Sequence, residues 1–193
     1  MKKRESTFLN MLVVLILIAL VAGFLLGYVN EITLEPKARV QQERKMNALK
    51  QVLPEFDNNL LEDQIKLATE GDSVEVFPAF KGEELVGIAL EGKSEKGFSG
   101  LVKTMVGFKP DGKIFKIAVT EQKETPGLGT KMKDDKFKQQ FEGQSPETFD
   151  LRVKKDGGQV DALTGATISS RAFIETVEDA YDNYKESIKT LEK

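Results

Sequence analysis

The stretch that decides the fold is LVKTMVGFKPDGKIFKIAV, residues 101–119. Two runs rich in β-branched and apolar residues, 101–108 and 114–119, flank the turn residues Pro110-Asp111-Gly112. This pattern predicts a β-hairpin, because proline, aspartate and glycine favour the backbone angles of a tight turn between extended runs. We therefore expect the surrounding domain to be built on antiparallel strands.

Helix-like and strand-like segments surround this hairpin, which gives an α+β class. A long helix is expected over residues 168–191, where apolar residues recur at helical spacing. Its apolar face comprises Ala172, Phe173, Val177, Ala180, Tyr181, Tyr184 and Ile188. The other expected elements are strands over 73–80 and 85–90 with a turn at 81–84, a short amphipathic helix over 134–141, a strand over 148–153 and a tight turn at 156–158.

Near the N-terminus the sequence MLVVLILIALVAGFLLGYV, residues 11–29, carries no charge for 19 residues. At about 1.5 Å per residue such a helix crosses a hydrocarbon core of about 30 Å. A cleavable signal peptide is the alternative, but the apolar run exceeds the usual length and no small-residue cleavage site follows it. We expect an uncleaved transmembrane anchor over residues 8–29.

The charges around this segment predict its orientation. Lys2, Lys3 and Arg4 precede it, so the positive-inside rule keeps residues 1–7 in the cytoplasm and places the rest outside. A helical stem is expected over 30–70, and the working domain over 71–193. The stem should contain one amphipathic helix that begins at Pro36 and ends before Pro54, and a short second helix over 60–69. The first of these either docks beside the bilayer or packs one face on the domain.

The composition excludes several classes of chemistry. The chain has no histidine and no cysteine, which removes histidine-assisted nucleophiles, c-type haem, thiolate-held clusters and ordinary zinc sites. No calcium-loop pattern occurs, and we predict no metal site. With 28 basic and 31 acidic residues the net charge is −3, which argues against nucleic-acid binding. Redox activity would need an organic cofactor.

Three glycine-bearing segments stand out as candidate binding loops: Gly97-Phe98-Ser99-Gly100, Glu124-Thr125-Pro126-Gly127-Leu128-Gly129 and Asp161-Ala162-Leu163-Thr164-Gly165-Ala166-Thr167. Each also has a purely structural interpretation. The first can be a strand entry with Phe98 in the core, and the second a turn that needs positive φ at Gly127. In the third, the hydroxyls of Thr164, Thr167, Ser169 and Ser170 can serve as helix caps. Alternatively, small residues at Gly165 and Ala166 let a ligand approach, and Thr167 meets the free N–H groups of the next helix, which favour a phosphate.

The order of these three motifs, with the hairpin around Asp111-Gly112-Lys113-Ile114, resembles the FMN-binding domain family. Over nearly its whole length the chain is similar to the G-subunit family of Rnf-type ion-translocating electron transport complexes. That resemblance implies a bacterial inner-membrane protein with one anchor, a stem and an extracytoplasmic FMN domain. It also implies an electron-carrying subunit, with other membrane subunits as partners, that is no stand-alone catalyst and has no catalytic residues of its own.

The resemblance also implies roles for individual residues. Thr167 would carry FMN through a phosphoester bond made by a flavin transferase that uses FAD. Asp161, Thr164, Gly165 and Ala166 would shape the segment that the transferase reads, while the loops 124–129 and 97–100 would lie near the flavin. Many relatives have a histidine two residues before the loop glutamate, where this chain has Gln122.

Two alternatives remain open at this point. The first is the C subunit of the sodium-translocating NADH:quinone reductase, which shares the anchor and the acceptor motif. The second belongs to another class of protein: an anchored extracytoplasmic binding or assembly module in which the three loops are only turns and no flavin is attached.

Overall fold

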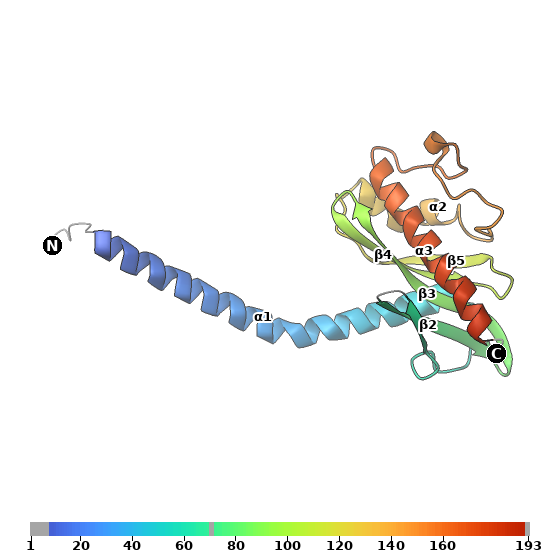
Figure 1. Cartoon of the computed structure of the whole chain (residues 1–193), viewed down its shortest axis with the longest axis horizontal. Helices are drawn as coiled ribbons and strands as arrows, with labels where there is room; N and C mark the ends of the chain where they lie inside the picture. The colour runs from blue at the N-terminus through green and yellow to red at the C-terminus, as the bar shows by residue number, and fades with distance from the viewer. Residues whose placement is uncertain (1–7, 70–71, 192–193) are drawn as a thin grey trace. The chain divides into compact units, whose positions relative to one another are not determined.

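The computed structural model describes residues 8–69 and 72–191. The chain divides into two compact units, Met1–Glu43 and Arg44–Lys193. The proposed cytoplasmic segment 1–7 lies outside the described residues, as does the expected boundary between stem and domain at residues 70 and 71. Figure 1 shows a long N-terminal helix, a twisted sheet and a C-terminal helix across that sheet.

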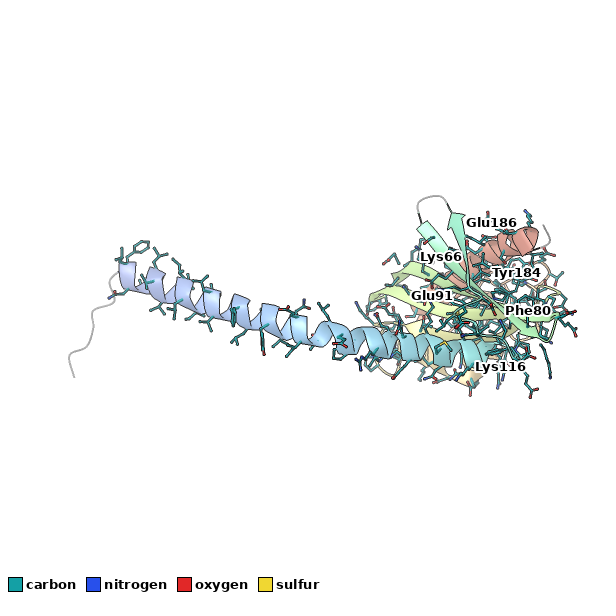
Figure 2. All side chains as sticks on the ribbon, turned by 90° about the horizontal axis from the view of Figure 1, so that it is seen from below. Lys66, Phe80, Glu91, Lys116, Tyr184 and Glu186 are labelled. Carbon is teal, nitrogen blue, oxygen red and sulfur yellow. The ribbon has the colours of Figure 1, made fainter. Side chains whose placement is uncertain are left out.

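Helix α1 spans Phe8–Val52 as one element of 45 residues. It is long and apolar enough to cross a membrane, and its apolar side chains stand out on all sides of its N-terminal part (Figure 2). The predicted start of a separate helix at Pro36 is wrong, because α1 continues through this residue. A proline removes its own N–H donor and crowds the carbonyl group four residues earlier, but the helix-forming residues around Pro36 keep the backbone helical on both sides.

The last turns of α1 belong to the domain. Leu49 and Val52 are fully buried among Phe77 and Met105 of the sheet. The contact is close enough that a Cβ on Gly107 would lie 1.7 Å from the carbonyl oxygen of Val52. Of the two interpretations of the amphipathic segment, packing on the domain therefore holds for its C-terminal end.

The sheet is an antiparallel meander in the order β1-β2-β3-β4-β5. Its strands are β1 Ile65–Thr69, β2 Asp72–Lys81, β3 Glu84–Gly97, β4 Gly100–Phe108 and β5 Ile114–Glu121. The predicted hairpin and the two upstream strands are confirmed, whereas the helix predicted over 60–69 is wrong. Ile65 and Leu67 alternate at strand spacing and pair with Val76 and Val74, so their pairing with β2 overrides the local helical pattern.

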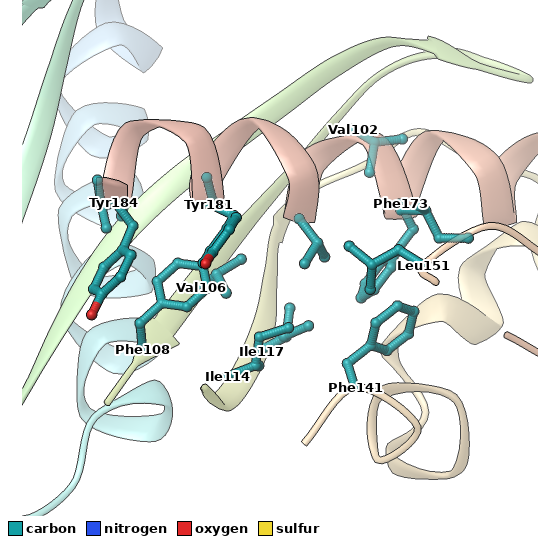
Figure 3. Packing of buried hydrophobic residues seen from close by; sticks show 14 of the residues in the cluster. Val102, Val106, Phe108, Ile114, Ile117, Phe141, Leu151, Phe173, Tyr181 and Tyr184 are labelled. Carbon is teal, nitrogen blue, oxygen red and sulfur yellow. The ribbon is translucent and has the colours of Figure 1, made fainter. Parts of the chain in front are cut away.

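Helix α3, Thr167–Leu191, covers the face of the sheet opposite the last turns of α1. The helix predicted over 168–191 is confirmed, and it begins one residue earlier, at Thr167. Alternate side chains of β4, such as Val106 and Phe108, point toward α3. Phe108 packs with its ring centroid 5.7 Å from that of Tyr181 and 4.8 Å from that of Tyr184 (Figure 3). A fully buried aromatic side chain of this kind contributes about 1.5–3 kcal/mol, so these contacts fix α3 on the sheet.

The segment between β5 and α3 contains mostly short elements: η1 Gly129–Lys133, α2 Asp135–Lys138 and η2 Lys154–Asp156. The helix predicted over 134–141 is therefore only partly formed. The strand predicted over 148–153 is wrong, since Val153 makes only an isolated bridge with Val160. Leu151 and Val153 give the alternating apolar pattern of a strand because both side chains pack into the core. In the described structure, however, most of this segment has no neighbouring strand with which to pair. The tight turn is confirmed, with φ +89° at Gly157.

Candidate functional site

A pocket of about 370 Å³ lies where the three glycine-bearing loops meet. Its position follows from the fold, because one loop joins β3 to β4, one follows β5, and one leads into α3. The lining residues are Phe98, Glu124, Thr125, Leu128, Gly129, Gly165, Ala166, Thr167, Ile168 and Ser169. The volume lies at the lower end of the range for small-molecule sites.

The β3–β4 turn brings Phe98 to the edge of the pocket. Gly97 and Gly100 pair across this turn, and a Cβ on Gly97 would lie 2.3 Å from the Gly100 carbonyl oxygen. The interpretation of Phe98 as a core residue is wrong, since its side chain is 67% exposed. It stands at the tip of a two-residue turn, beyond the layer that α3 covers, and lines the pocket instead.

The loop over 124–129 has the geometry expected from its glycines. Gly127 adopts φ +75°, as predicted, and its N–H donates to the Thr130 hydroxyl at 2.9 Å. The Leu128 N–H donates to the Thr125 carbonyl oxygen at 3.2 Å. This tight turn exposes Leu128 at the edge of the pocket.

Glu124 holds the three loops together from inside. Its side chain is only 4% exposed. Oε1 accepts the Ser99 N–H at 3.0 Å, and Oε2 accepts the Ser169 hydroxyl at 2.6 Å. Gln122 accepts the Glu124 N–H through Oε1 at 2.6 Å. The role of this glutamine in the structure is thus to fix the backbone that carries Glu124.

The four hydroxyls of the third segment have different environments. Ser170 is a local cap, because its Oγ accepts the Leu163 N–H at 2.9 Å and donates to the Ala166 carbonyl oxygen at 2.9 Å. Ser169 is bonded to Glu124, and Thr164 lies exposed outside the pocket. Thr167 begins α3, lines the pocket and is half-buried, and no hydrogen bond joins its hydroxyl to another residue in the described part of the chain.

The structure brings most of the predicted residues together. Those that line the pocket are Phe98, Glu124, Thr125, Leu128, Gly129, Gly165, Ala166 and Thr167. Gly97, Ser99, Gly100 and Gly127 shape the loops without lining it. Asp161 lies apart, with its carboxylate 2.7 Å from the Lys154 ammonium and its N–H on Gln140, so it anchors the start of the segment.

Sequence reasoning missed two lining residues, Ile168 and Ser169. Ile168 stands four residues before the buried Ala172, a spacing that would place it in the core. It is nevertheless 48% exposed, because the first turn of α3 extends past the layer beneath it. Ser169 has the sequence pattern of a helix cap, and no local signal marks its contact with a glutamate 45 residues away.

The surface around the pocket is apolar, with Phe98, Leu128 and Ile168 exposed at its edge. The described lining contains one carboxylate and no lysine or arginine. The first backbone N–H groups of α3 lie beside it, and helix N-termini favour anionic groups such as phosphates. This arrangement suits a flat, largely apolar ring system with a phosphate of low charge.

Comparison with known proteins agrees with this chemistry. The FMN-binding domain family matches residues 97–182, a range that includes all three loops. The fold and the pocket therefore define an FMN-binding domain.

Relatives extend the match to the rest of the chain. The G subunit of the ion-translocating oxidoreductase complex from Shewanella loihica is 35% identical over 188 residues, which are 91% of this chain and 88% of the relative. The corresponding protein from Aliivibrio fischeri (strain ES114) is 30% identical over 194 residues, 92% of each chain. The chain belongs to the G-subunit family of ion-translocating oxidoreductase complexes.

A solved structure shares the fold. The crystal structure of the C subunit of the Na(+)-translocating NADH-quinone reductase from Parabacteroides distasonis matches with a TM-score of 0.52 at 20% identity. It covers 70% of this chain and 77% of that chain. At this identity the likeness concerns the architecture alone and gives the C-subunit alternative little support.

Proposed function

We propose that the chain is the FMN-bearing electron-carrier subunit of an ion-translocating oxidoreductase, with FMN attached to Thr167 through a phosphoester bond. The observation that carries this proposal is the environment of Thr167. Of the four hydroxyls in and after the acceptor segment, it alone both lines the pocket and has no hydrogen-bond partner among the described residues. Its oxygen is therefore free to form a bond to phosphorus.

The charges of the pocket support a covalent link over a dissociable cofactor. A phosphate monoester carries about −1.5 to −2 charges at neutral pH, and proteins usually hold it with lysine or arginine. The described pocket lining has neither, and the Glu124 carboxylate lies in the same wall. A phosphodiester carries one negative charge, which the N–H groups at the start of α3 can stabilise.

The remaining residues would bind and orient the cofactor. Phe98, Leu128 and Ile168 offer apolar surface to the isoalloxazine ring. At Gly129 and Gly165 the absence of a side chain lets the cofactor approach the backbone closely. When bound, FMN itself supplies the electron-transfer chemistry, so the chain needs no catalytic base of its own. This fits a protein without histidine and cysteine.

We further propose that α1 anchors the domain in the bacterial inner membrane, with the N-terminus in the cytoplasm and the domain outside. Its length, its apolar surface and the basic residues before it support this orientation. The other membrane subunits of the complex would then be the redox partners, and anchoring would raise their effective concentration around the carrier. The link to Thr167 would be made by a flavin transferase: the Thr167 oxygen attacks the FMN phosphorus of FAD, and AMP leaves.

The test is to express the full-length chain with and without a flavin transferase and to weigh it after denaturation. We expect a fluorescent band in the denaturing gel and a mass increase of FMN less one water, only with the transferase. Thr167→Ala should abolish both signals. The matched variant Thr190→Ala, which removes an exposed hydroxyl near the other end of α3, should keep them. A co-expressed protein that stays dark at its unmodified mass would favour the binding or assembly module instead.

A further inference from the structure

Building on the proposed function, we infer that Glu124 is a positioning residue, which directs the Thr167 hydroxyl into the pocket by holding the first turn of α3. The two oxygens of its carboxylate face two different loops. Oε1 binds the Ser99 N–H of the β3–β4 turn, and Oε2 binds the Ser169 hydroxyl of α3. One buried side chain thus joins all three elements that line the pocket.

The glycines around Glu124 show how closely the loops meet at this carboxylate. A Cβ on Gly97 would lie 2.6 Å from Oε1, and a Cβ on Gly129 would lie 2.8 Å from Oε2. Both distances are too short for any side chain other than hydrogen. The carboxylate is therefore confined from two sides, and its rotamer is fixed by backbone rather than by mobile side chains.

The contact with Ser169 controls the direction of Thr167. Successive residues of an α-helix are rotated by about 100°, so the position of Ser169 on the helix determines where Thr167 points, two residues earlier. The same contact is buried, because Ser169 is 2% exposed. Without it the first turn of α3 is held by fewer bonds and is free to fray, since the side-chain hydrogen bonds that remain there in the described structure are those of Ser170.

The chemistry of the contact also favours positioning over a direct role on the cofactor. A carboxylate buried with two neutral donors loses its hydration and needs both donors to compensate. Its oxygens are turned toward Ser99 and Ser169, within the protein wall. The negative charge close to a phosphate site would be unfavourable for binding, so the benefit of this residue lies in the loop geometry.

The experiment compares four full-length variants as acceptors for a purified flavin transferase with FAD: Glu124→Ala, Ser169→Ala, Glu124→Gln and Thr104→Val. Thr104→Val is the matched control, because it removes a buried hydrogen bond to Thr176 (2.7 Å) outside the pocket. For each we would measure kcat and KM of FMN incorporation and the hydrogen–deuterium exchange of the 97–100 turn before flavin attachment.

Glu124→Ala and Ser169→Ala should lower kcat by about tenfold or more, the equivalent of one lost buried hydrogen bond, with little change in KM. Exchange in the turn should accelerate in Glu124→Ala. Glu124→Gln should restore most of the rate, since its amide oxygen can accept the Ser99 N–H and its nitrogen can donate to Ser169. Thr104→Val should keep the wild-type kcat.

Wild-type kcat in Glu124→Ala would overturn the inference, as would an equal loss of kcat in Thr104→Val. A wild-type chain that takes up no FMN would instead overturn the proposed function, and this inference with it. The two failures are thus distinguished by the wild-type reaction.

Discussion

Substitution of Gly129 tests how the pocket is built, because the structure separates two reasons for a glycine within one loop. At Gly129 the backbone angles suit any residue, but a Cβ would lie 2.6 Å from the Ser169 hydroxyl oxygen and 2.7 Å from the Glu124 Cβ. At Gly127 the reverse holds. Its φ is +75°, and a Cβ would meet no atom within 4 Å. Gly129→Ala therefore perturbs contacts, and Gly127→Ala perturbs only the backbone.

The expected magnitudes differ accordingly. In Gly129→Ala the crowding costs about 1–3 kcal/mol, and separation of Ser169 from Glu124 adds about 1–3 kcal/mol for a buried polar group that loses its partner. The sum is about 2–6 kcal/mol. In Gly127→Ala the left-handed conformation costs about 1–2 kcal/mol, offset by about 0.4–1 kcal/mol from the stiffer unfolded chain, so about 1 kcal/mol remains.

The assay is guanidinium unfolding of the full-length protein in detergent micelles, followed by near-ultraviolet circular dichroism. Tyr181 and Tyr184 lie in the domain core and report its unfolding. Gly129→Ala should lower both the free energy of unfolding and the yield of attached FMN, whereas Gly127→Ala should lower the former slightly. If Gly129→Ala is no more destabilised than Gly127→Ala, crowding at the Glu124 carboxylate is not the reason for a glycine at position 129.

Two further predictions concern pH and orientation. Burial raises the pKa of Tyr181 to about 12 from 10.0, so the folded state favours the neutral phenol. That stabilisation is complete below about pH 10 and is lost as the pH rises toward 12. The free energy of unfolding of wild type, measured by denaturant titration relative to that of Tyr181→Phe, should therefore fall over this window. A difference that stays constant from about pH 10 to 12 would contradict this prediction. For orientation, Lys185→Cys introduces a single thiol into a cysteine-free chain at an exposed site. A membrane-impermeant maleimide should label it in spheroplasts without lysis, and labelling only after lysis would reverse the proposed topology.

Much of the fold could be predicted because local patterns and tertiary pairing agree. The hairpin around Pro110-Asp111-Gly112 and the apolar face of α3 are specified by turn residues and by spacing, and the structure has both. Strand β1 was not predicted because its five residues, three of them apolar, fit equally well as part of a helix. Only the pairing of Ile65 with Val76 distinguishes a strand from a helix here, and Val76 lies outside the segment.

The candidate site could be predicted at the level of loops but not of contacts. Glycines and hydroxyls marked the three segments, and Gly127 has the positive φ that its turn requires. Which hydroxyl faces the pocket depends on partners far away in sequence, since Ser169 is taken up by Glu124. The exposure of Phe98 depends on where the layer above the sheet ends, a property that no local pattern carries.

The pocket loops are distant in sequence, and they meet because helix α3 crosses strand β3 at one point. Helix α3 passes over β3 so closely that a Cβ on Gly92 would lie 1.8 Å from the Thr176 carbonyl oxygen. Beyond it the two elements run side by side, since the Glu175 carboxylate accepts the Ser94 hydroxyl at 2.7 Å and the Lys96 ammonium at 2.6 Å.

From this crossing, Thr167 lies nine residues back along the helix, about 14 Å at about 1.5 Å per residue. Gly97 lies five residues along the strand, about 17 Å at about 3.3 Å per residue. The start of α3 and the end of β3 therefore lie at similar distances from the crossing, and both lie at the same pocket. A shift of α3 by one turn, about 5.4 Å, would take Thr167 away from Phe98, so the glycine at position 92 fixes the site from a distance.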